Sequence, residues 1–580
     1  MGSGVFAACL GAKILSYPFT GPPRLESIPD GLFAGLSGVK LFNYVFNQCA
    51  SLSGVAENTF EGCASVTTMM YAFGNCTSLQ SIPDKLFRDM TDSVIFSYVF
   101  STCRSLEAIP SGLFSTCTGA TSFERAFFNS TSLKTVPDSL FEGMTKATSF
   151  AYCFSGCTGL VSAGDNLFKN ASAATSFSNV FSGCTSLIDV GLNIFSGCSS
   201  ATTFIYAFSQ CSLLVSMPLF TDCNKVTSFQ RCFFNCNSLR EITPYAFENK
   251  TLATDFQYVF SRCSSLAEVP AGVFRGCSAV TAFAYAFQGC ANIVSLAGDT
   301  FEGCGKVSNA QYLFESCTSL LALPPALLSS FVSLSSSTAM MFAGCTSLTA
   351  IPAGFLDNCT ALTALTSTFM GCTSLTSLPP KLLKYNVKLT TVTRMFAGCT
   401  SLKDIPEDLF STNMLITSFS NVFSGAGLTT IPERLFSNCT SAVTFTYAFY
   451  ETPVASVPGE LFRFNTRATT FEYLFYGCTQ LERVGNGLFD DTAVTSLYRV
   501  FAGCNVLTTS LQSIFSLSSY PSVTTTQYAF YNCPVTGSGL ALITALPGVT
   551  TATGRANTFI GATSLNDYDQ IPKAWGGPAE

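Results

Sequence analysis

TSFSNVFSGCTSL, at residues 175–187, is the stretch that decides the fold, because its pattern returns along nearly the whole chain. TAFAYAFQGC at 281–290 and TRMFAGCTSL at 393–402 are two further copies. The Phe that stands three residues before the Cys marks each copy, and we call it the marker Phe. From Phe46 to Phe208 the marker recurs every 27 residues, and later copies, as far as Phe559, follow at steps of 25 to 29. Self-similarity at such a period indicates a stack of short structural repeats.

The composition of the 580 residues fits many copies of one unit better than several unrelated domains. The chain has 55 Phe but one Trp, 27 Cys but no His, and 11% charged residues, against about a quarter in ordinary soluble domains. One 27-residue coil cannot bury its own Phe, Leu and Ile columns, whereas stacked coils can. The sequence therefore predicts a repeat solenoid of about twenty coils that folds as one array.

Each coil consists of two half-units, F-x-x-C-x-x-L-x-x-I-P and L-F-x-x-C-x-x-V-T-x-F, whose apolar columns recur about every three residues. That period is neither the 3.6 of an amphipathic helix nor the 2 of a half-buried strand. It indicates a tight coil that turns a corner every few residues. We expect short parallel β-strands at S-L-x-x-I and around V-T-x-F, joined by turns or single 3₁₀ turns. The Pro after Ile should end the first strand, because Pro cannot donate a ladder hydrogen bond.

The two ends of the chain depart from the repeat. We interpret residues 1–18 as a partial first coil without an N-terminal cap, with a vector-derived remnant at residues 1–4. Residues 19–558 form the predicted solenoid, and residues 559–580 a diverged C-terminal cap and tail that carries the only Trp, Trp575. Because solenoids need polar caps, the uncapped first coil predicts that the protein continues at that end or docks onto a neighbour there.

Charge and hydropathy exclude two classes of partner. The formal net charge is −6, and no cluster of Lys and Arg of the kind that follows a phosphate backbone occurs, so we expect no nucleic acid partner. No apolar run reaches the roughly 18 residues of a membrane helix, so we expect no membrane insertion. The first residues, MGSGVFAACLGAKILSYPF, lack the basic and apolar regions of a secretory signal peptide.

The cysteines fall into columns. Sixteen stand three residues after a marker Phe, nine, including Cys9, occupy the equivalent place in the second half-unit, and Cys153 and Cys232 directly precede a marker. Same-column cysteines of neighbouring coils would lie about one strand spacing apart, within bridging reach. Ser130 and Ala426, however, replace single members without the loss of a partner. We predict a buried ladder of reduced thiols, with scattered disulfides as the alternative, and no zinc site, because no paired C-x-x-C motifs occur.

The sequence holds no constellation of residues suited to catalysis. The absence of His removes the commonest general base and metal ligand. The many Ser and Thr belong to the repeated C-T-S-L corner, where hydroxyls can bond to local backbone. No Gly-rich loop precedes a helix as phosphate binding requires. We therefore expect neither enzymatic activity nor a cofactor or metal.

The position two residues before the marker Phe is the candidate binding column. Two interpretations remain open. The side chains either cover apolar surface and stabilise the stack, or they form a stripe that binds a partner, since Tyr and Arg are enriched at binding hot spots and aromatic faces suit sugar rings. The Tyr and Arg members, which make up the candidate binding stripe, are Tyr44, Tyr71, Tyr98, Arg125, Tyr152, Tyr206, Arg231, Tyr258, Tyr285, Tyr312, Arg394, Tyr447, Tyr473, Arg499 and Tyr528. The remaining members of the column are Asn179, Asn421, Asn557, Met340 and Ser367.

These repeats resemble the leucine-rich repeats of BspA-like surface proteins, in particular the subtype that reads roughly V-T-x-M-x-x-M-F-x-x-C-x-S-L. The resemblance covers nearly the entire chain, and it implies a right-handed leucine-rich-repeat solenoid used in adhesion or recognition. This chain departs from the pattern in having Phe where many relatives have Met, and in its even 27-residue step. Separately, TSLNDYDQIPKAWGG at 563–577 looks like the closing segment of leucine-rich-repeat proteins encoded among phage and prophage tail genes.

The two resemblances imply two functions, of which we favour the first. The first is a phage tail-associated fibre or spike that binds a bacterial surface receptor. The second is a BspA-like bacterial cell-surface adhesin that binds a host protein or glycan. A purely structural scaffold is a third. We expect an extracellular protein, at a virion tail or a bacterial cell surface, whose partners are a cell-surface protein or glycan and other subunits of a virion or surface assembly.

Overall fold

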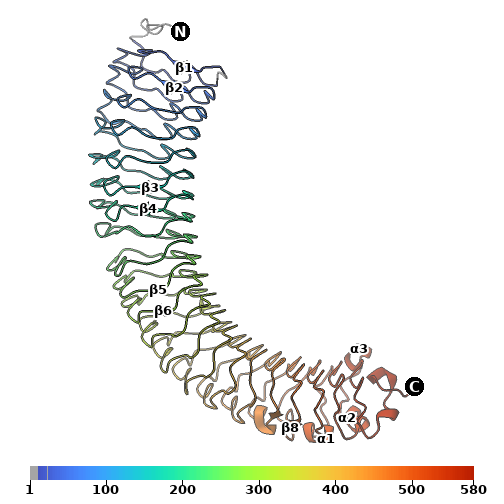
Figure 1. The fold of residues 1–580 in the computed structure, drawn as a ribbon. Helices are drawn as coiled ribbons and strands as arrows, with labels where there is room; N and C mark the ends of the chain where they lie inside the picture. The colour runs from blue at the N-terminus through green and yellow to red at the C-terminus, as the bar shows by residue number, and fades with distance from the viewer. Residues whose placement is uncertain (1–10, 22–23) are drawn as a thin grey trace. The chain divides into compact units, whose positions relative to one another are not determined.

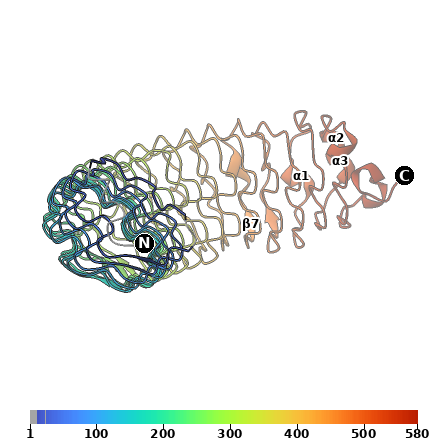
Figure 2. The same ribbon diagram turned by 90° about the horizontal axis from the view of Figure 1, so that it is seen from above.

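The computed structural model describes residues 11–21 and 24–580, so the predicted half-coil that contains Cys9 lies largely outside the described residues. The chain divides into two compact units. The N-terminal unit holds the residues up to Asn292 together with Thr300–Cys304, and the C-terminal unit holds Ile293–Asp299 and Gly305–Glu580. Within each unit the coils are stacked one upon the next (Figure 1). Seen from above, the coils of the N-terminal unit lie over one another (Figure 2).

Regular β-structure is limited to two-residue strands that pair in parallel between neighbouring coils. β1 (Ser27–Ile28) pairs with β2 (Gly54–Val55), and this pairing is one coil apart in sequence. The other strands are β3 (Ser162–Ala163), β4 (Asp189–Val190), β5 (Glu268–Val269), β6 (Ser295–Leu296), β7 (Ser456–Val457) and β8 (Arg483–Val484). A second row of single parallel bridges joins residues five before the marker, as from Ser122 to Ser149. These two rows confirm the predicted strand positions, and β1 ends immediately before Pro29.

Helices gather in the last third of the described chain. They are η2 (Gly459–Phe462), α1 (Leu511–Ile514), α2 (Gly539–Ala545), α3 (Ala552–Arg555), η3 (Tyr568–Gln570) and η4 (Lys573–Trp575), of which the η elements are 3₁₀ turns. In the part of the chain that the structure describes, no helix has both the length and the apolar character needed to span a membrane.

Backbone hydrogen bonds explain the three-residue period of the sequence. The amide of Ala126 donates to the carbonyl of Phe123, 3.1 Å away, which closes a tight turn within the coil. The next amide, of Phe127, donates instead to the carbonyl of Cys153 in the following coil, at 2.9 Å. Alternation between turn closure and coil-to-coil bonds satisfies the backbone without long strands or helices. Every corner therefore sends one side chain inward.

Three interlocking columns of Phe fill the core. Marker rings stack on the next marker, as Phe127 does on Phe154 with ring centroids 5.6 Å apart and planes 5° apart. Rings four residues before the marker and fourteen after it meet at steep angles, as Phe123 and Phe114 do at 4.9 Å and 70°. All of these rings are fully buried, and each contributes roughly 1.5–3 kcal/mol by leaving water. The core thus depends on neighbouring coils.

The cysteines line the same core and act as hydrogen-bond donors. All 26 described cysteines are buried thiols, which confirms the predicted burial of the column. The Cys103 thiol donates to the carbonyl of Phe73 in the preceding coil, at 3.2 Å, and burial raises its pKa to about 12. Ser130 replaces Cys in this column because its hydroxyl makes the same bond to the carbonyl of Phe100, at 3.1 Å. A hydroxyl group can therefore replace the thiol as the hydrogen-bond donor at this position.

The end of the chain folds against the last coil. Trp575 is 7% exposed and packs beside the last marker, Phe559, with centroids 6.4 Å apart. The Asp567 carboxylate accepts hydrogen bonds from the Ser538 hydroxyl and from the amides of Gly539 and Leu540 at the start of α2, the amide bonds being 2.8 and 3.1 Å long. Burial alone would raise the pKa of Asp567, but these bonds outweigh it and hold the pKa below its usual value.

Candidate functional site

The candidate binding column has a left-handed backbone at every one of its twenty positions. The φ angles lie between 53° and 60°, and no member of the column is Gly. This conformation costs an L-amino acid roughly 1–2 kcal/mol, because Cβ approaches the following carbonyl oxygen. We call its members from Tyr44 to Tyr285 the N-terminal ladder and those from Tyr312 to Asn557 the C-terminal ladder, one in each unit.

A second left-handed column in the same coils provides an internal comparison. It lies two residues after the marker, and all twenty of its members also have positive φ. Here Gly occupies ten positions and Asn four, as the backbone conformation favours. Gly and Asn thus relieve the backbone strain in the second column, whereas Tyr and Arg stand in the candidate binding column of the same coils in spite of that strain. The backbone conformation does not explain why Tyr and Arg occupy the ladder positions. We therefore look for the explanation in the contacts of their side chains.

Tyrosines of the N-terminal ladder stack face to face. Tyr44 and Tyr71 have centroids 4.9 Å apart, and Tyr71 and Tyr98 have centroids 4.2 Å apart, with planes within 18°. The three side chains are half-buried, and burial raises the pKa of Tyr71 to about 12. Because neighbouring rings cover each other, the ring faces within this run are covered and only ring edges and hydroxyl groups are left at its surface. Ring faces, which would suit sugars, are available only where the run is interrupted.

Arginines continue the ladder by lying between tyrosine rings. The Arg125 guanidinium carbon lies 5.2 Å from the ring centroid of Tyr98 and 4.3 Å from that of Tyr152, and Arg125 donates a hydrogen bond to the Tyr98 hydroxyl. Arg231 is held in the same way, 5.3 Å from Tyr206 and 4.4 Å from Tyr258. Such cation–π contacts stabilise by roughly 0.5–1 kcal/mol at exposed sites. These contacts hold the positively charged guanidinium groups in place between the tyrosine rings of the ladder.

The C-terminal ladder is less regular. Ser367 is buried and Arg394 is exposed, whereas the other members are half-buried. Tyr447 and Tyr473 stack with centroids 4.4 Å apart. Arg499 then lies 5.7 Å from the Tyr473 ring and 4.6 Å from the Tyr528 ring. The structure therefore brings the predicted Tyr and Arg residues together at this end of the C-terminal unit.

Two groups of aromatic residues beside the ladders escape the sequence reasoning. Tyr17, two residues before Phe19, has φ 68° and stacks on Tyr44 at 4.7 Å, so it extends the N-terminal ladder by one coil. The spacing to Phe19 was the signal that could have found it. Further aromatic residues stand one after the marker and flank the ladder, as Tyr476 does beside Tyr473 with centroids 5.6 Å apart. The other members of this flanking group are Phe128, Phe234, Tyr450 and Tyr531.

A hollow of about 530 Å³ lies where the aromatic run of the C-terminal ladder ends, and we call it the ladder-end hollow. The next coil after Tyr528 supplies Asn557 in place of a ring, so the aromatic and Arg members of the C-terminal ladder end at Tyr528. The residues that line the hollow are Tyr476, Arg499, Ala502, Tyr528, Tyr531, Asn557 and Ile560.

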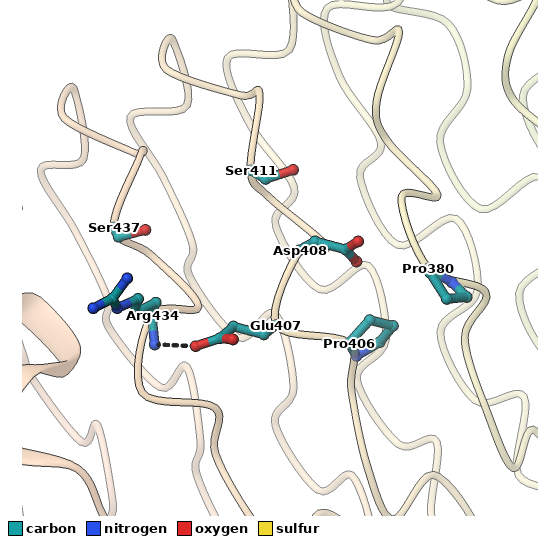
Figure 3. A pocket seen from close by; sticks show the side chains of 7 residues that line it. All are labelled: Pro380, Pro406, Glu407, Asp408, Ser411, Arg434 and Ser437. Carbon is teal, nitrogen blue, oxygen red and sulfur yellow. Dashed lines mark hydrogen bonds between the residues drawn. The ribbon is translucent and has the colours of Figure 1, made fainter.

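Other hollows belong to the repeat. A hollow of about 500 Å³ contains Glu407 and Asp408 (Figure 3), but both carboxylates already accept backbone hydrogen bonds, from the amides of Arg434 at 3.2 Å and Lys381 at 3.1 Å. A hollow in the N-terminal unit, around Asp138, uses the equivalent part of the coil. Among the described residues, no group of three or more His, Cys, Asp or Glu is arranged to hold a metal ion.

Comparisons with known proteins identify the repeat. The family model described as the BspA type leucine rich repeat region matches residues 179–321 with six copies. A leucine-rich repeat protein from Bacteroides ovatus is 16% identical, with 72% of this chain and 92% of that chain covered and a TM-score of 0.30. A leucine-rich repeat protein from Eubacterium ventriosum is also 16% identical, with coverage of 72% and 92% and a TM-score of 0.27.

A leucine rich cell surface protein from Faecalibacterium prausnitzii is likewise 16% identical, with 81% of this chain and 87% of that chain covered and a TM-score of 0.21. No curated protein matches the chain. The 27-residue columns and parallel bridges described above run through both units. Residues 179–321 therefore match the BspA type leucine rich repeat region, and the chain has the fold of a leucine-rich-repeat solenoid.

Proposed function

We propose that this chain is an extracellular, non-enzymatic recognition protein whose Tyr and Arg ladders bind a cell-surface protein or glycan. The observation that carries the proposal is that Tyr or Arg stands at fifteen of the twenty left-handed positions, none of which is Gly. Tyr and Arg are also the residue types in which binding hot spots are enriched.

Stacking offsets part of the backbone strain, but not at every position. An aromatic pair contributes roughly 0.5–1.5 kcal/mol, which is comparable to the strain at a stacked tyrosine such as Tyr71. Arg394 has the same strain at φ 56°, yet it is exposed and lies between Ser367 and Asn421, neither of which carries a ring. At such a position, stacking on ladder neighbours cannot offset the free energy of the backbone strain. A role for the exposed guanidinium in binding explains why it is kept.

Binding of the fluorescently labelled chain to a panel of bacterial cells and to mammalian epithelial cells tests the proposal. The ladder variant combines Tyr44→Gly, Tyr71→Gly and Tyr98→Gly. The matched control makes the same change in the second left-handed column of the same coils, Gln48→Gly, Asn75→Gly and Thr102→Gly. We expect labelling to fall at least tenfold in the ladder variant only. Equal loss in both variants, or no labelling of any cell, contradicts the proposal.

The kind of cell distinguishes the two biological settings. A bacterial adhesin of the BspA type would label epithelial cells. A phage tail-associated fibre or spike would label bacteria, selectively by strain, and the segment at 563–577, with its likeness to phage and prophage tail proteins, is the observation that favours it. In that segment Asp567 and Trp575 hold the end of the chain on the last coil, which serves either setting. A scaffold would label neither kind of cell.

A further inference from the structure

The ladder-end hollow has the size and lining of a small-ligand site. Its volume, about 530 Å³, falls within the roughly 300–1,000 Å³ typical of ligand pockets. The Tyr528 ring forms one wall, and Tyr531 meets it at a steep angle, 73°, with centroids 5.7 Å apart. Ala502 and Ile560 add apolar surface. The Tyr531 side chain is 37% exposed, and an exposed aromatic ring beside apolar side chains is the surface on which the CH groups of a sugar ring pack.

The polar groups of the hollow favour an anionic ligand. Arg499 is the only charged residue in the described lining, and no carboxylate lies within salt-bridge distance of it among the described residues. Its Nε is buried without a hydrogen-bond partner. By contrast, Arg125 pairs with Glu124 at 3.2 Å. The described partners of the Arg499 guanidinium are the tyrosine rings around it and a hydrogen bond with Tyr498, so a bound carboxylate would supply a counter-charge.

The backbone around the hollow disfavours an extended peptide. Strand addition needs a row of unpaired amides and carbonyls. Here the amide of Arg499 donates to the carbonyl of Gln527 at 3.0 Å, and that of Tyr528 to the carbonyl of Ala556 at 3.2 Å. The amides of Tyr476, Ala502 and Tyr531 close turns within their coils. Only side chains are left to recognise a ligand, and phenol hydroxyls and the Asn557 amide both donate and accept, as sugar hydroxyls require.

We propose that the ladder-end hollow binds a carboxylate-bearing sugar, with the sugar ring against Tyr531 and the carboxylate at the Arg499 guanidinium. Asn557 and Tyr476 bond to the hydroxyl groups. This inference deepens the proposed recognition function and rests on it, but it concerns a single site in the C-terminal unit. It makes the glycan, and in particular an acidic one, the partner at this end.

Isothermal titration of the full chain with two pairs of sugars tests the site. The pairs are 3′-sialyllactose with lactose, and tetragalacturonate with its methyl ester, so that each acidic sugar has a neutral counterpart and the two sources of carboxylate are separated. We expect at least one acidic sugar to bind about tenfold more tightly than its neutral partner, which is about 1.4 kcal/mol. Preference for the acidic sugar should shrink as salt rises, since the contact is charged.

Three variants separate the contributions. Arg499→Gln should bind the acidic and neutral sugars of a pair equally, whereas Tyr531→Ala should weaken both at least tenfold. The control is Arg463→Gln, which removes an arginine of the same unit that lies outside the ladders and pairs with Glu460 at 2.7 Å, and it should leave sugar binding unchanged. Trp575 fluorescence verifies that each variant keeps the folded C-terminal end.

The proposal is overturned if neither acidic sugar binds at millimolar concentration, if each pair binds equally to the unchanged chain, or if Arg499→Gln keeps the preference. Cell labelling that depends on the N-terminal ladder, with no sugar bound, would leave the recognition function standing and remove this site. Sugar binding without any cell labelling would leave this site standing and contradict the proposed recognition function.

Discussion

Replacement of Tyr528 by Gly and by Ala should give stabilities in the opposite order to the one usual for these residues. Tyr528 has φ 56°, in the left-handed region, whereas its neighbour Gln527 is half-buried like it but has no positive φ. Gly adopts the left-handed conformation freely and Ala does not. Tyr528→Gly should therefore be more stable than Tyr528→Ala, and Gln527→Gly less stable than Gln527→Ala.

The magnitudes follow from the contacts of Tyr528. Both substitutions there remove the Arg499 contact at 4.6 Å, worth roughly 0.5–1 kcal/mol. They also remove the Tyr531 contact at 5.7 Å, worth roughly 0.5–1.5 kcal/mol. Ala loses about 1–2.5 kcal/mol, and Gly loses about 1 kcal/mol less because it relieves the strain. At Gln527 the Gly variant should be about 0.4–1 kcal/mol less stable than the Ala variant, because its unfolded chain is freer.

Urea unfolding followed by fluorescence of the single Trp provides the assay. Trp575 packs beside Phe559, which stacks on Phe530 at 5.8 Å, so its signal reports the end of the array that contains Tyr528. Long repeat arrays do not unfold in one step, and this local probe avoids that complication. The same order of Gly and Ala at Tyr528 and Gln527 would refute the argument that the ladder retains its side chains against backbone strain.

Three further predictions concern the core and the chain end. Cys103, whose pKa burial raises to about 12, should not react with Ellman's reagent at pH 8 until urea is added; reaction within seconds in the native chain would contradict the buried thiol ladder. Burial lowers the pKa of Lys250 although its ammonium group donates to the Thr221 carbonyl and to Asn224, so the charged form is penalised in the folded state, and Lys250→Met, which has no titratable group, should be the more stable chain at pH 7. That gain should shrink as pH rises towards the unfolded lysine pKa, and a pH-independent urea midpoint difference would exclude the linkage. Asp567→Ala should cost the α2 end about 1–2 kcal/mol by Trp575 fluorescence, with the exposed Asp569→Ala as control. Because the Asp567 pKa is lowered, this contribution should disappear as pH falls through it, and equal costs of the two variants would argue against the cap.

The repeat architecture follows from the sequence because each column faces one environment. A Phe every 27 residues can be buried only if neighbouring coils align, and the stacked rings of Phe127 and Phe154 confirm that alignment. The two rows of parallel bridges occur at the predicted S-L-x-x-I and V-T-x-F positions. The residue type of each column was thus sufficient to predict which side chains form the core.

Only part of the candidate site could be predicted by the same reasoning. The column from Tyr44 to Tyr528 could be predicted, because it interrupts an apolar pattern. Its left-handed backbone could not, since Tyr and Arg are not residues that this conformation favours. The loss of ring faces to stacking depends on the distance between coils. The ladder-end hollow depends on Asn557 following Tyr528 one coil later. Asn179 and Asn421 stand in the same column, and the spacing in the sequence does not show which Asn borders a hollow.

Oxidative footprinting of the labelled chain, free and bound to the cells that it recognises, tests the central claim most directly. Mass spectrometry would compare ladder tyrosines such as Tyr44, Tyr71 and Tyr258 with Tyr245 and Tyr385, which are 44% and 46% exposed outside the ladders. We predict that binding protects the ladder tyrosines and leaves Tyr245 and Tyr385 as reactive as before. Protection of Tyr245 and Tyr385 with unchanged oxidation along the ladders would place the binding face elsewhere and contradict the account.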